Sequence, residues 1–194
     1  MSPYTPPLRD IRFVMEHVAD LDAITSTELF GHVDGETIVD VLSEVGRLMA
    51  DVVAPTNRDG DTIGSQWQAG DVTAGATGGT VVPPPSFRTA YAKWVESGFG
   101  AMPFDPDYGG AGFPWLTAIA VQEMLTSANM ALSLCPLLTQ GAIDAIHAHG
   151  SDEQKATYLP KMLTGEWTGT MNLTEPQAGS DVGAVTPKAE PALD

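Results

Sequence analysis

The sequence is short of basic residues. It holds 9 Lys and Arg against 25 Asp and Glu, which gives a formal net charge of -16 at pH 7 over 194 residues. A surface this acidic repels the phosphate backbone of nucleic acids and anionic lipid, so we expect neither as a partner. A ligand that carries phosphate groups would have to be held by local backbone donors rather than drawn in by the overall field.

Cysteine is almost absent. Cys135 is the only one, so no disulfide can form within the chain, and a disulfide-rich secreted scaffold is not indicated. It lies in the apolar run "LSLCPLL", where we expect a small buried hydrophobic residue rather than a reactive thiol. The sequence also shows no spacing of histidine and cysteine that is typical of a metal site.

Long hydrophobic runs are missing as well. No apolar stretch approaches the roughly 20 residues that a membrane-spanning helix needs. The opening "MSPYTPPLRD" has no basic stretch followed by an apolar core, so it does not resemble a signal peptide. The composition, 43% hydrophobic and 18% charged, is typical of a globular protein. We therefore expect a cytoplasmic protein.

What the sequence does contain is a series of helical patterns. Residues 8–30 predict one or two short helices, and Asp34 is the expected N-cap of a longer one that Pro55 ends. That helix should bury a broad apolar stripe. The stripe consists of Ile38, Val41, Leu42, Val45, Leu48, Met49 and Val52.

Turn residues separate the later patterns. Residues 56–85 are rich in Gly, Thr and Asp and predict a long surface loop or a short hairpin. A helix that Ser86 caps and Gly98 ends should follow, and then a tight corner at 107–110. Pro114 is expected to open a helix through Met124. Three more helices are predicted at about 129–138, at 141–149 and after Ser151.

The residue pattern changes from helical to β-like at Trp167. The stretch "EWTGTMNLTE" favours a β-strand, and "GAVTPKAE" at 183–190 could start a second one. A sheet of one or two strands cannot stand alone. The chain is therefore expected to end inside a second, β-rich domain.

The stretch "MNLTEPQAGSD", residues 171–181, concentrates hydroxyls and backbone amides. Thr174 and Ser180 offer hydroxyls, and Gly179 permits close approach of the backbone, so together they could cradle an anionic or electron-rich flat ligand. A plain turn whose Ser and Asp cap local amides explains the same residues. On spacing alone the plain turn is the better interpretation.

Three ordered motifs resemble the acyl-CoA dehydrogenase family. "TEPQAGSD" resembles the family signature T-E-P-x-A-G-S-D, and "PDYGGAGFPWLTAIAVQEM" resembles its Y-G-G-x-G corner followed by a helix that carries a Glu, here Glu123. "GSDEQKATYLPKM" resembles the G-x-x-x-Q-K-x-x-Y-L-P stretch that leads into the signature. The resemblance covers residues 34–194. The opening "YTPPLRDIRFVMEHV" is more like the N-terminal extension of the larger bacterial members.

The resemblance implies a mainly α fold class, with an N-terminal helical domain and the first strand or strands of a middle β-domain. The implied domains are an N-terminal helical extension at 1–33, the α-helical N-terminal domain at 34–166, and an incomplete start of the middle β-domain at 167–194. In the family a helical C-terminal domain follows, and FAD is bound among the three.

The implied activity is α,β-dehydrogenation of an acyl-CoA thioester to a trans-2-enoyl-CoA, in fatty-acid or related acyl-CoA catabolism. The implied cofactor is FAD, and the implied electron acceptor is an electron-transfer flavoprotein or a similar protein. A homo-oligomer, dimer or tetramer, is expected for the full-length protein. Two alternatives stay open: an oxidase-like flavoenzyme of the same fold, and a non-catalytic helical interaction module.

The resemblance also implies site residues. The flavin-binding positions would be Met171, Leu173, Thr174, Gly179 and Ser180. Thr174 would face the edge of the flavin ring, and Ser180 would lie by the pyrophosphate and the CoA. The family usually has an aromatic residue where this chain has Met171. The implied lining of the acyl chain is Leu134, Leu137, Leu138 and Gly141, although core packing explains these four as well.

No catalytic residue is predicted in this sequence. The family's general base comes from the C-terminal helical domain, and neither Glu123 nor Glu175 is a good candidate for it. His147 and His149 are expected at the surface near a helix end.

Overall fold

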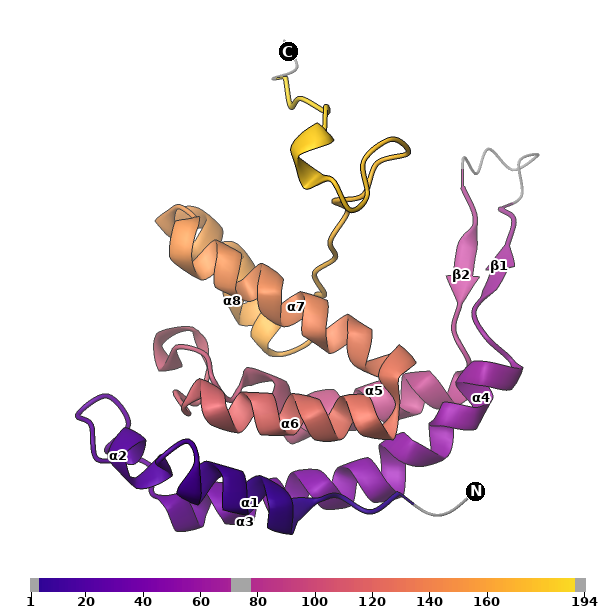
Figure 1. Ribbon diagram of the computed structural model, residues 1–194. Coiled ribbons are helices and arrows are strands. Elements are labelled where there is room, and N and C mark those ends of the chain that lie inside the picture. Colours follow the sequence, from indigo (N-terminus) through magenta and orange to yellow (C-terminus); the bar gives the residue numbers. More distant parts are fainter. Residues whose placement is uncertain (1–3, 71–77, 191–194) are drawn as a thin grey trace.

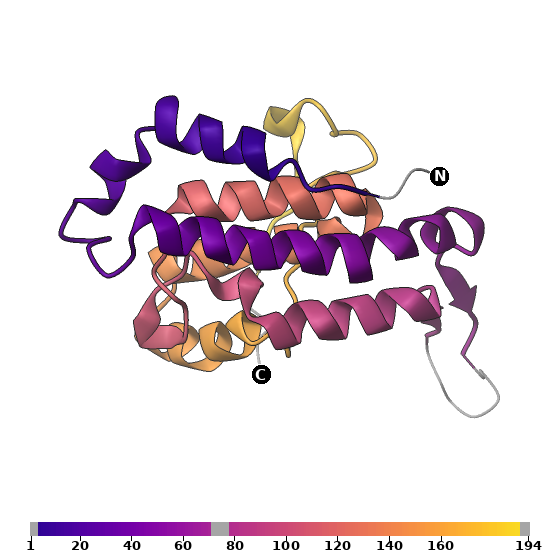
Figure 2. The ribbon, with the colours of Figure 1, turned by 90° about the horizontal axis from the view of Figure 1, so that it is seen from below.

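Tiers of helices make up the computed structural model, which describes residues 4–70 and 78–190 (Figure 1). One outer tier holds α1 (Leu8–His17), α2 (Leu21–Thr25) and α3 (Gly35–Leu48). The middle tier holds α5 (Pro85–Ser97) and α6 (Trp115–Ala128), and the other outer tier holds α7 (Met130–His149) and α8 (Asp152–Leu163). Seen from below, α3, α5 and α6 run along roughly the same direction (Figure 2).

The core lies where α3 packs against α1 and α6. The predicted stripe of α3 is confirmed, because its central members are fully buried and the others pack against them. The fully buried members are Ile38, Leu42, Val45 and Met49. The predicted N-cap is also confirmed, since the backbone N–H of Thr37 donates to Asp34 Oδ1 at 2.7 Å. This bond holds the pKa of Asp34 below its ordinary value.

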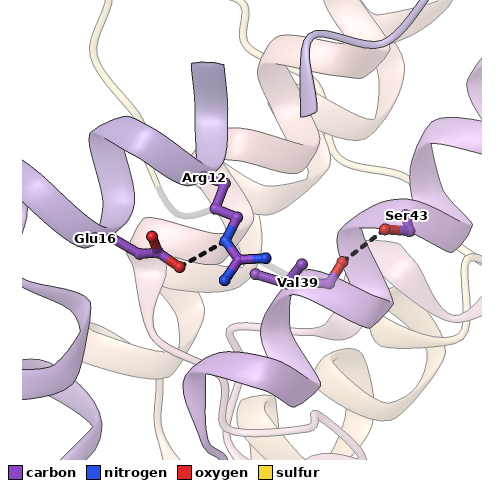
Figure 3. A network of polar contacts seen from close by, with 4 residues as sticks. All are labelled: Arg12, Glu16, Val39 and Ser43. Carbon is purple, nitrogen blue, oxygen red and sulfur yellow. Dashed lines mark hydrogen bonds and ion pairs between the residues drawn. The ribbon is translucent and has the colours of Figure 1, made fainter. Parts of the chain in front are cut away.

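Helix α1 covers α3 from the outside and buries Ile11 and Met15. Figure 3 shows polar contacts at the surface of this pair of helices. Within α1, Arg12 Nε donates to Glu16 Oε1 at 2.6 Å, and within α3, Ser43 Oγ donates to the Val39 carbonyl at 2.9 Å. Both are bonds within one helix, so the apolar contacts carry the packing between α1 and α3.

The prediction that Pro55 ends the long helix is wrong. After α3 the chain continues through a π-helical turn (Met49–Val53) and a 3-10 turn (Ala54–Thr56) into α4 (Asn57–Thr62). A proline inside an α-helix lacks an N–H and clashes with the carbonyl four residues earlier, and a local change of helix type relieves both problems. Buried Thr56 stabilises the change: its hydroxyl donates to the Val53 carbonyl at 2.7 Å and accepts from Asn129 Nδ2 at 2.9 Å.

A short antiparallel hairpin follows α4, and it confirms the hairpin alternative for residues 56–85. Strand β1 (Gln66–Gln68) pairs with β2 (Thr80–Val82), with Trp67 opposite Val81. The part of the predicted loop at 71–77 lies outside the described residues. The expectation of a loop was wrong for α4, whose polar sequence carries no apolar stripe that would have revealed it.

Of the two predicted ends of α5, the first is wrong and the second is confirmed. Ser86 does not cap the helix: Pro84 is the N-cap, Pro85 is the first helical residue, and the buried Ser86 hydroxyl has no partner among the residues that the structure describes. Proline suits the first turn because the N–H it lacks would have no partner there. Gly98 does end the helix, with a φ of 71° that a glycine adopts without strain.

The predicted corner at 107–110 is confirmed. A 3-10 turn (Pro106–Tyr108) leads to Gly109 with a φ of 101°. Its N-cap, Asp105, accepts a bond from the backbone N–H of Asp107 at 2.9 Å and contacts His147 Nε2 at 3.1 Å, and these two contacts lower the pKa of Asp105. His147 is partly exposed at the end of α7, as predicted.

Helices α6 and α7 are both longer than predicted. Helix α6 reaches Ala128 rather than Met124, and the two helices predicted at 129–138 and 141–149 are one, α7, with Pro136 inside it. Pro136 lies in the second turn, and Gly141 adopts ordinary helical backbone, so neither residue ends the helix. Asn129 caps α7 by accepting the Leu132 N–H at 3.0 Å.

The prediction that Cys135 is a buried core residue is wrong, because its side chain is exposed. The apolar run around it extends over more of the helix circumference than the buried face of α7 can cover. That buried face consists of Leu132, Ser133, Pro136, Thr139 and Ile143.

The last part of the chain differs from the prediction of strands. Ser151 and Gln154 form a capping box that begins α8, as expected. Within residues 166–190, however, the only β-pairing is an isolated bridge between Glu175 and Ala178, and a 3-10 turn (Val182–Ala184) replaces the second expected strand. A strand needs a partner for its hydrogen bonds, and no other described segment lies alongside. Figure 1 shows this segment leaving the helices beside α7.

No helix in the described ranges is long and apolar enough to cross a membrane.

The buried face of α3 yields the first prediction. Leu42→Asp or Val45→Asp should destabilise the fold by several kcal/mol, because each places an unpaired charge in the core. Thermal and urea unfolding measure the effect. The matched controls are Leu29→Asp and Val18→Asp, at side chains that are 73% and 71% exposed, and both should unfold close to the parent. If Val45→Asp unfolds like Val18→Asp, the assignment of the core face is wrong.

Candidate functional site

An open groove runs between α7 and the segment that follows α8. It has a volume of about 500 Å³. Leu137, Leu138, Gly141 and Ala142 of α7 form one wall, and residues 170–173 form the other. The groove therefore brings three of the four predicted acyl-chain positions, Leu137, Leu138 and Gly141, against the first part of the predicted flavin-binding stretch.

The helical spacing of residues in α7 explains why they form one wall of the groove. Leu134, Leu137, Leu138 and Gly141 recur at spacings of three and four residues and so lie on one face. This face differs from the buried one, and Leu134 and Leu137 remain partly exposed. A Cβ added at Gly141 would meet no atom within 4 Å, so the helix backbone is uncovered at that point. Leu134 lies one turn before the groove and does not line it.

The opposite wall is an extended segment with unpaired backbone donors. In the described part of the chain, none of the backbone N–H groups of residues 170–174 donates a hydrogen bond. Met171 and Leu173 are 65% and 45% exposed, so apolar side chains accompany these donors. Such a segment can bind a flat ligand that has apolar faces and polar edges.

A closed turn follows this wall. The backbones of Glu175 and Ala178 exchange two hydrogen bonds, at 2.9 and 3.1 Å. Glu175 Oε2 accepts from the backbone N–H of Thr186 at 3.1 Å, from the Thr186 hydroxyl at 3.3 Å, and from Gln177 Nε2. The Glu175 carboxylate thus stabilises the turn. It does not line the groove.

The remaining predicted cofactor positions lie around this turn. Thr174, Gly179 and Ser180 are exposed and do not line the groove. Gly179 lies opposite Thr174, because a Cβ added at Gly179 would approach Thr174 Cγ2 to 3.8 Å. The structure therefore brings Met171 and Leu173 to α7, and it groups Thr174 with Gly179 at the turn.

Ionisable groups are scarce in the groove. Glu123 is exposed on α6 and does not line it. Neighbouring atoms partly desolvate the Cys135 thiol even though its side chain reaches solvent, and this raises its pKa, so the thiol stays protonated at neutral pH. Among residues 4–70 and 78–190, no group of three or more His, Cys, Asp or Glu side chains could hold a metal ion. The groove offers apolar surface and backbone donors rather than acid–base chemistry of its own.

Sequence reasoning missed three groove residues: Ala142, Thr170 and Asn172. Each is a chain neighbour of a predicted one, and no residue type among them signals a ligand. It also missed Thr139, whose hydroxyl accepts a bond from the backbone N–H of Gly169 at 3.1 Å and holds the two walls together. A single threonine in an apolar helix carries no pattern that could have revealed this contact.

The helical part of the chain matches a known domain family. Residues 80–166 match the family model described as acyl-CoA dehydrogenase, N-terminal domain. The chain is 40% identical over 191 residues to 3-methylmercaptopropionyl-CoA dehydrogenase of Ruegeria pomeroyi, covering 98% of this chain and 31% of that protein. It is 34% identical over 189 residues to a butyryl-CoA dehydrogenase of Syntrophomonas wolfei, covering 97% of this chain and 30% of that protein. The chain belongs to the acyl-CoA dehydrogenase family.

A solved structure agrees in fold. Butyryl-CoA dehydrogenase from Megasphaera elsdenii matches with a TM-score of 0.59 and 21% identity, over 80% of this chain and 34% of that one. The chain spans about a third of the length of the curated relatives it matches, 31% and 30% for the two named above.

Proposed function

We propose that the protein acts as an FAD-dependent acyl-CoA dehydrogenase and that this chain supplies the acyl-chain groove and part of the flavin-binding surface. The observation that carries the proposal is the groove between α7 and residues 170–173, where predicted acyl-chain and predicted flavin positions meet. Membership of the family supports it, as does the fact that the two relatives named above are both acyl-CoA dehydrogenases.

The residues present fit a flavin. Unpaired backbone N–H groups at Leu173 and Thr174 and the exposed side chains of Met171 and Leu173 provide donors and apolar contact in one segment. Leu173 and Thr174 would donate to the edge of the isoalloxazine ring, while Gly179 and Ser180 would hold the pyrophosphate and CoA side. When bound, FAD supplies the acceptor for the hydride that leaves Cβ of the substrate. Donors aimed at the ring stabilise the negative charge that develops on it.

The groove orients the acyl chain, and we assign no general base within this chain. Removing a proton from Cα requires a carboxylate placed against it and a hydrogen-bonded thioester carbonyl. Glu175 is engaged in its turn and Glu123 lies on α6 away from the groove. In our proposal the base comes from the helical C-terminal domain that the family carries.

The wider organisation belongs to the same proposal. We assign residues 1–33 to an N-terminal helical extension, 34–166 to the helical N-terminal domain and 167–194 to the start of the middle β-domain. An electron-transfer flavoprotein or a similar protein as acceptor, a homo-oligomeric state and a cytoplasmic location are predictions from the sequence and the family resemblance. An oxidase of the same fold differs in its use of O₂, so a comparison of O₂ and dye acceptors separates the two activities.

The open backbone at Gly141 predicts an effect on substrate choice. In the complete enzyme, Gly141→Leu should fold normally but fill the groove, raising KM for long-chain acyl-CoA about tenfold with little effect on short chains. Steady-state kinetics over a series of acyl-CoA chain lengths measures this. Ala148→Leu, at an exposed position of α7 outside the groove, is the matched control. An unchanged chain-length profile in Gly141→Leu would remove α7 from the acyl site.

The turn residues predict three graded effects in the complete enzyme. Thr174→Val preserves shape and removes one donor, so it should slow flavin reduction by about 3 kcal/mol in transition-state free energy. Ser180→Ala should weaken cofactor or CoA binding by about 1 kcal/mol. A bulky residue at Gly179 should be worse than either, because the backbone could no longer approach the ligand. Anaerobic flavin reduction and melting temperature are the measurements. Unchanged reduction rates and flavin content in all three would leave the stretch as an ordinary turn.

The assignment of the base predicts the behaviour of the 194-residue chain alone. It should show no turnover of acyl-CoA with added FAD and a dye acceptor, and it should bind FAD weakly or not at all. Turnover by this chain would contradict the assignment of the base to another domain. If the complete protein also purifies without flavin, the non-catalytic helical module becomes the better hypothesis.

A further inference from the structure

The two walls of the groove are joined by one hydrogen bond. The backbone N–H of Gly169 donates to Thr139 Oγ1 at 3.1 Å, across 30 residues of sequence. Thr139 is a buried residue of α7, two residues before Gly141 and three before Ala142. Gly169 comes directly before the wall formed by residues 170–173. The bond therefore links α7 to the start of the segment that carries the predicted flavin positions.

The Thr139 hydroxyl is oriented for this task. Its own proton is donated to the Cys135 carbonyl at 2.8 Å, one turn earlier in α7. The oxygen keeps its two lone pairs as acceptors, and one of them accepts from the Gly169 N–H. Threonine at this position is restricted in χ1, so the acceptor is held in place before the segment packs against it.

Close packing also holds the backbone at Gly169 against α7 and α8. A Cβ added at Gly169 would lie 2.4 Å from Ala142 Cβ and 3.3 Å from Met162 Cε, so the backbone rests directly on α7 and α8. Two residues earlier, the Trp167 N–H donates to the Lys161 carbonyl at 3.0 Å. The chain is thus held at 167 and again at 169.

Beyond Gly169 the wall has no hydrogen bond of its own. Within the described residues, the next backbone bonds after Gly169 are those of the turn at Glu175 and Ala178. The position of residues 170–174 relative to α7 therefore depends on the Gly169 contact at one end and on the turn at the other.

We infer that Thr139 is a positioning residue: through Gly169 it sets the distance and register of residues 170–174 against the acyl-chain face of α7, and so of the flavin edge against the substrate Cβ. The inference rests on the proposed function. Thr139 itself touches neither ligand. Its effect is on alignment, and a misplacement of the reacting groups by about 1 Å can cost on the order of 100-fold in rate.

Thr139→Val tests the inference in the complete flavoenzyme, because valine keeps the shape and removes the acceptor. Thr139→Ser keeps the hydroxyl and should restore the parent behaviour. Thr157→Val is the matched control: the Thr157 hydroxyl donates to the Glu153 carbonyl at 2.7 Å, the same bond within a helix, but within residues 4–70 and 78–190 it accepts nothing from another segment.

Two readouts are taken on each variant. Amide hydrogen exchange reports on the contact itself, and the Gly169 N–H should exchange about tenfold faster in Thr139→Val only. Anaerobic stopped-flow reduction reports on alignment. There the limiting rate of flavin reduction should fall about tenfold, with the apparent Kd for substrate changed less than about twofold, in Thr139→Val and not in Thr139→Ser or Thr157→Val.

Each outcome decides the inference. Faster Gly169 exchange with an unchanged reduction rate overturns the positioning role and leaves the proposed function intact. A parent protein whose flavin is not reduced by any acyl-CoA overturns the proposed function, and the inference falls with it. Equal losses in Thr139→Val and Thr139→Ser would reject the hydrogen bond as the cause.

A second pair of variants covers the case in which Thr139→Val fails to fold. Gly169→Ala should push the segment away from α7 through the contact with Ala142 Cβ and slow flavin reduction. Ala142→Gly removes that methyl group, so the double variant should recover part of the rate. A reduction rate in Gly169→Ala equal to that of the parent would contradict the inference independently.

Discussion

The structure depends on the two faces of helix α7. One face packs against the rest of the domain and includes Leu132 and Ile143, while the face with Leu137 and Gly141 stays uncovered. A helix that is apolar nearly all round requires cover on both sides. In the described residues that second cover is partial: residues 170–173 lie along one side of the face and leave a groove. The packing of the domain on one face of α7 therefore leaves the other face to form the groove.

Much of the fold could be predicted from residue patterns, because capped amphipathic stripes such as the one from Asp34 to Met49 depend on local physics. Two of the failures share a cause, which is that distant contacts decided them. Thr56 and Asn129 stabilise a change of helix type near Pro55 that the proline alone does not reveal. The strand predicted at Trp167 is absent because a strand depends on partners that no described segment supplies.

The candidate site was predictable only where its residues form a continuous pattern in the sequence. The signature stretch and the apolar face of α7 are continuous patterns, and the groove brings Met171 and Leu173 against Leu137. The contact between Thr139 and Gly169 joins single residues 30 positions apart, and no local pattern encodes such a pair. Short, isolated polar contacts therefore escape sequence reasoning even where they align the walls of a site.

Anaerobic titration of the complete protein with acyl-CoA, followed at the flavin absorption band, tests the central claim most directly. The account predicts a yellow protein whose band bleaches as substrate is added, with the corresponding trans-2-enoyl-CoA as product. A colourless protein, or a flavin band that no acyl-CoA bleaches, would contradict it.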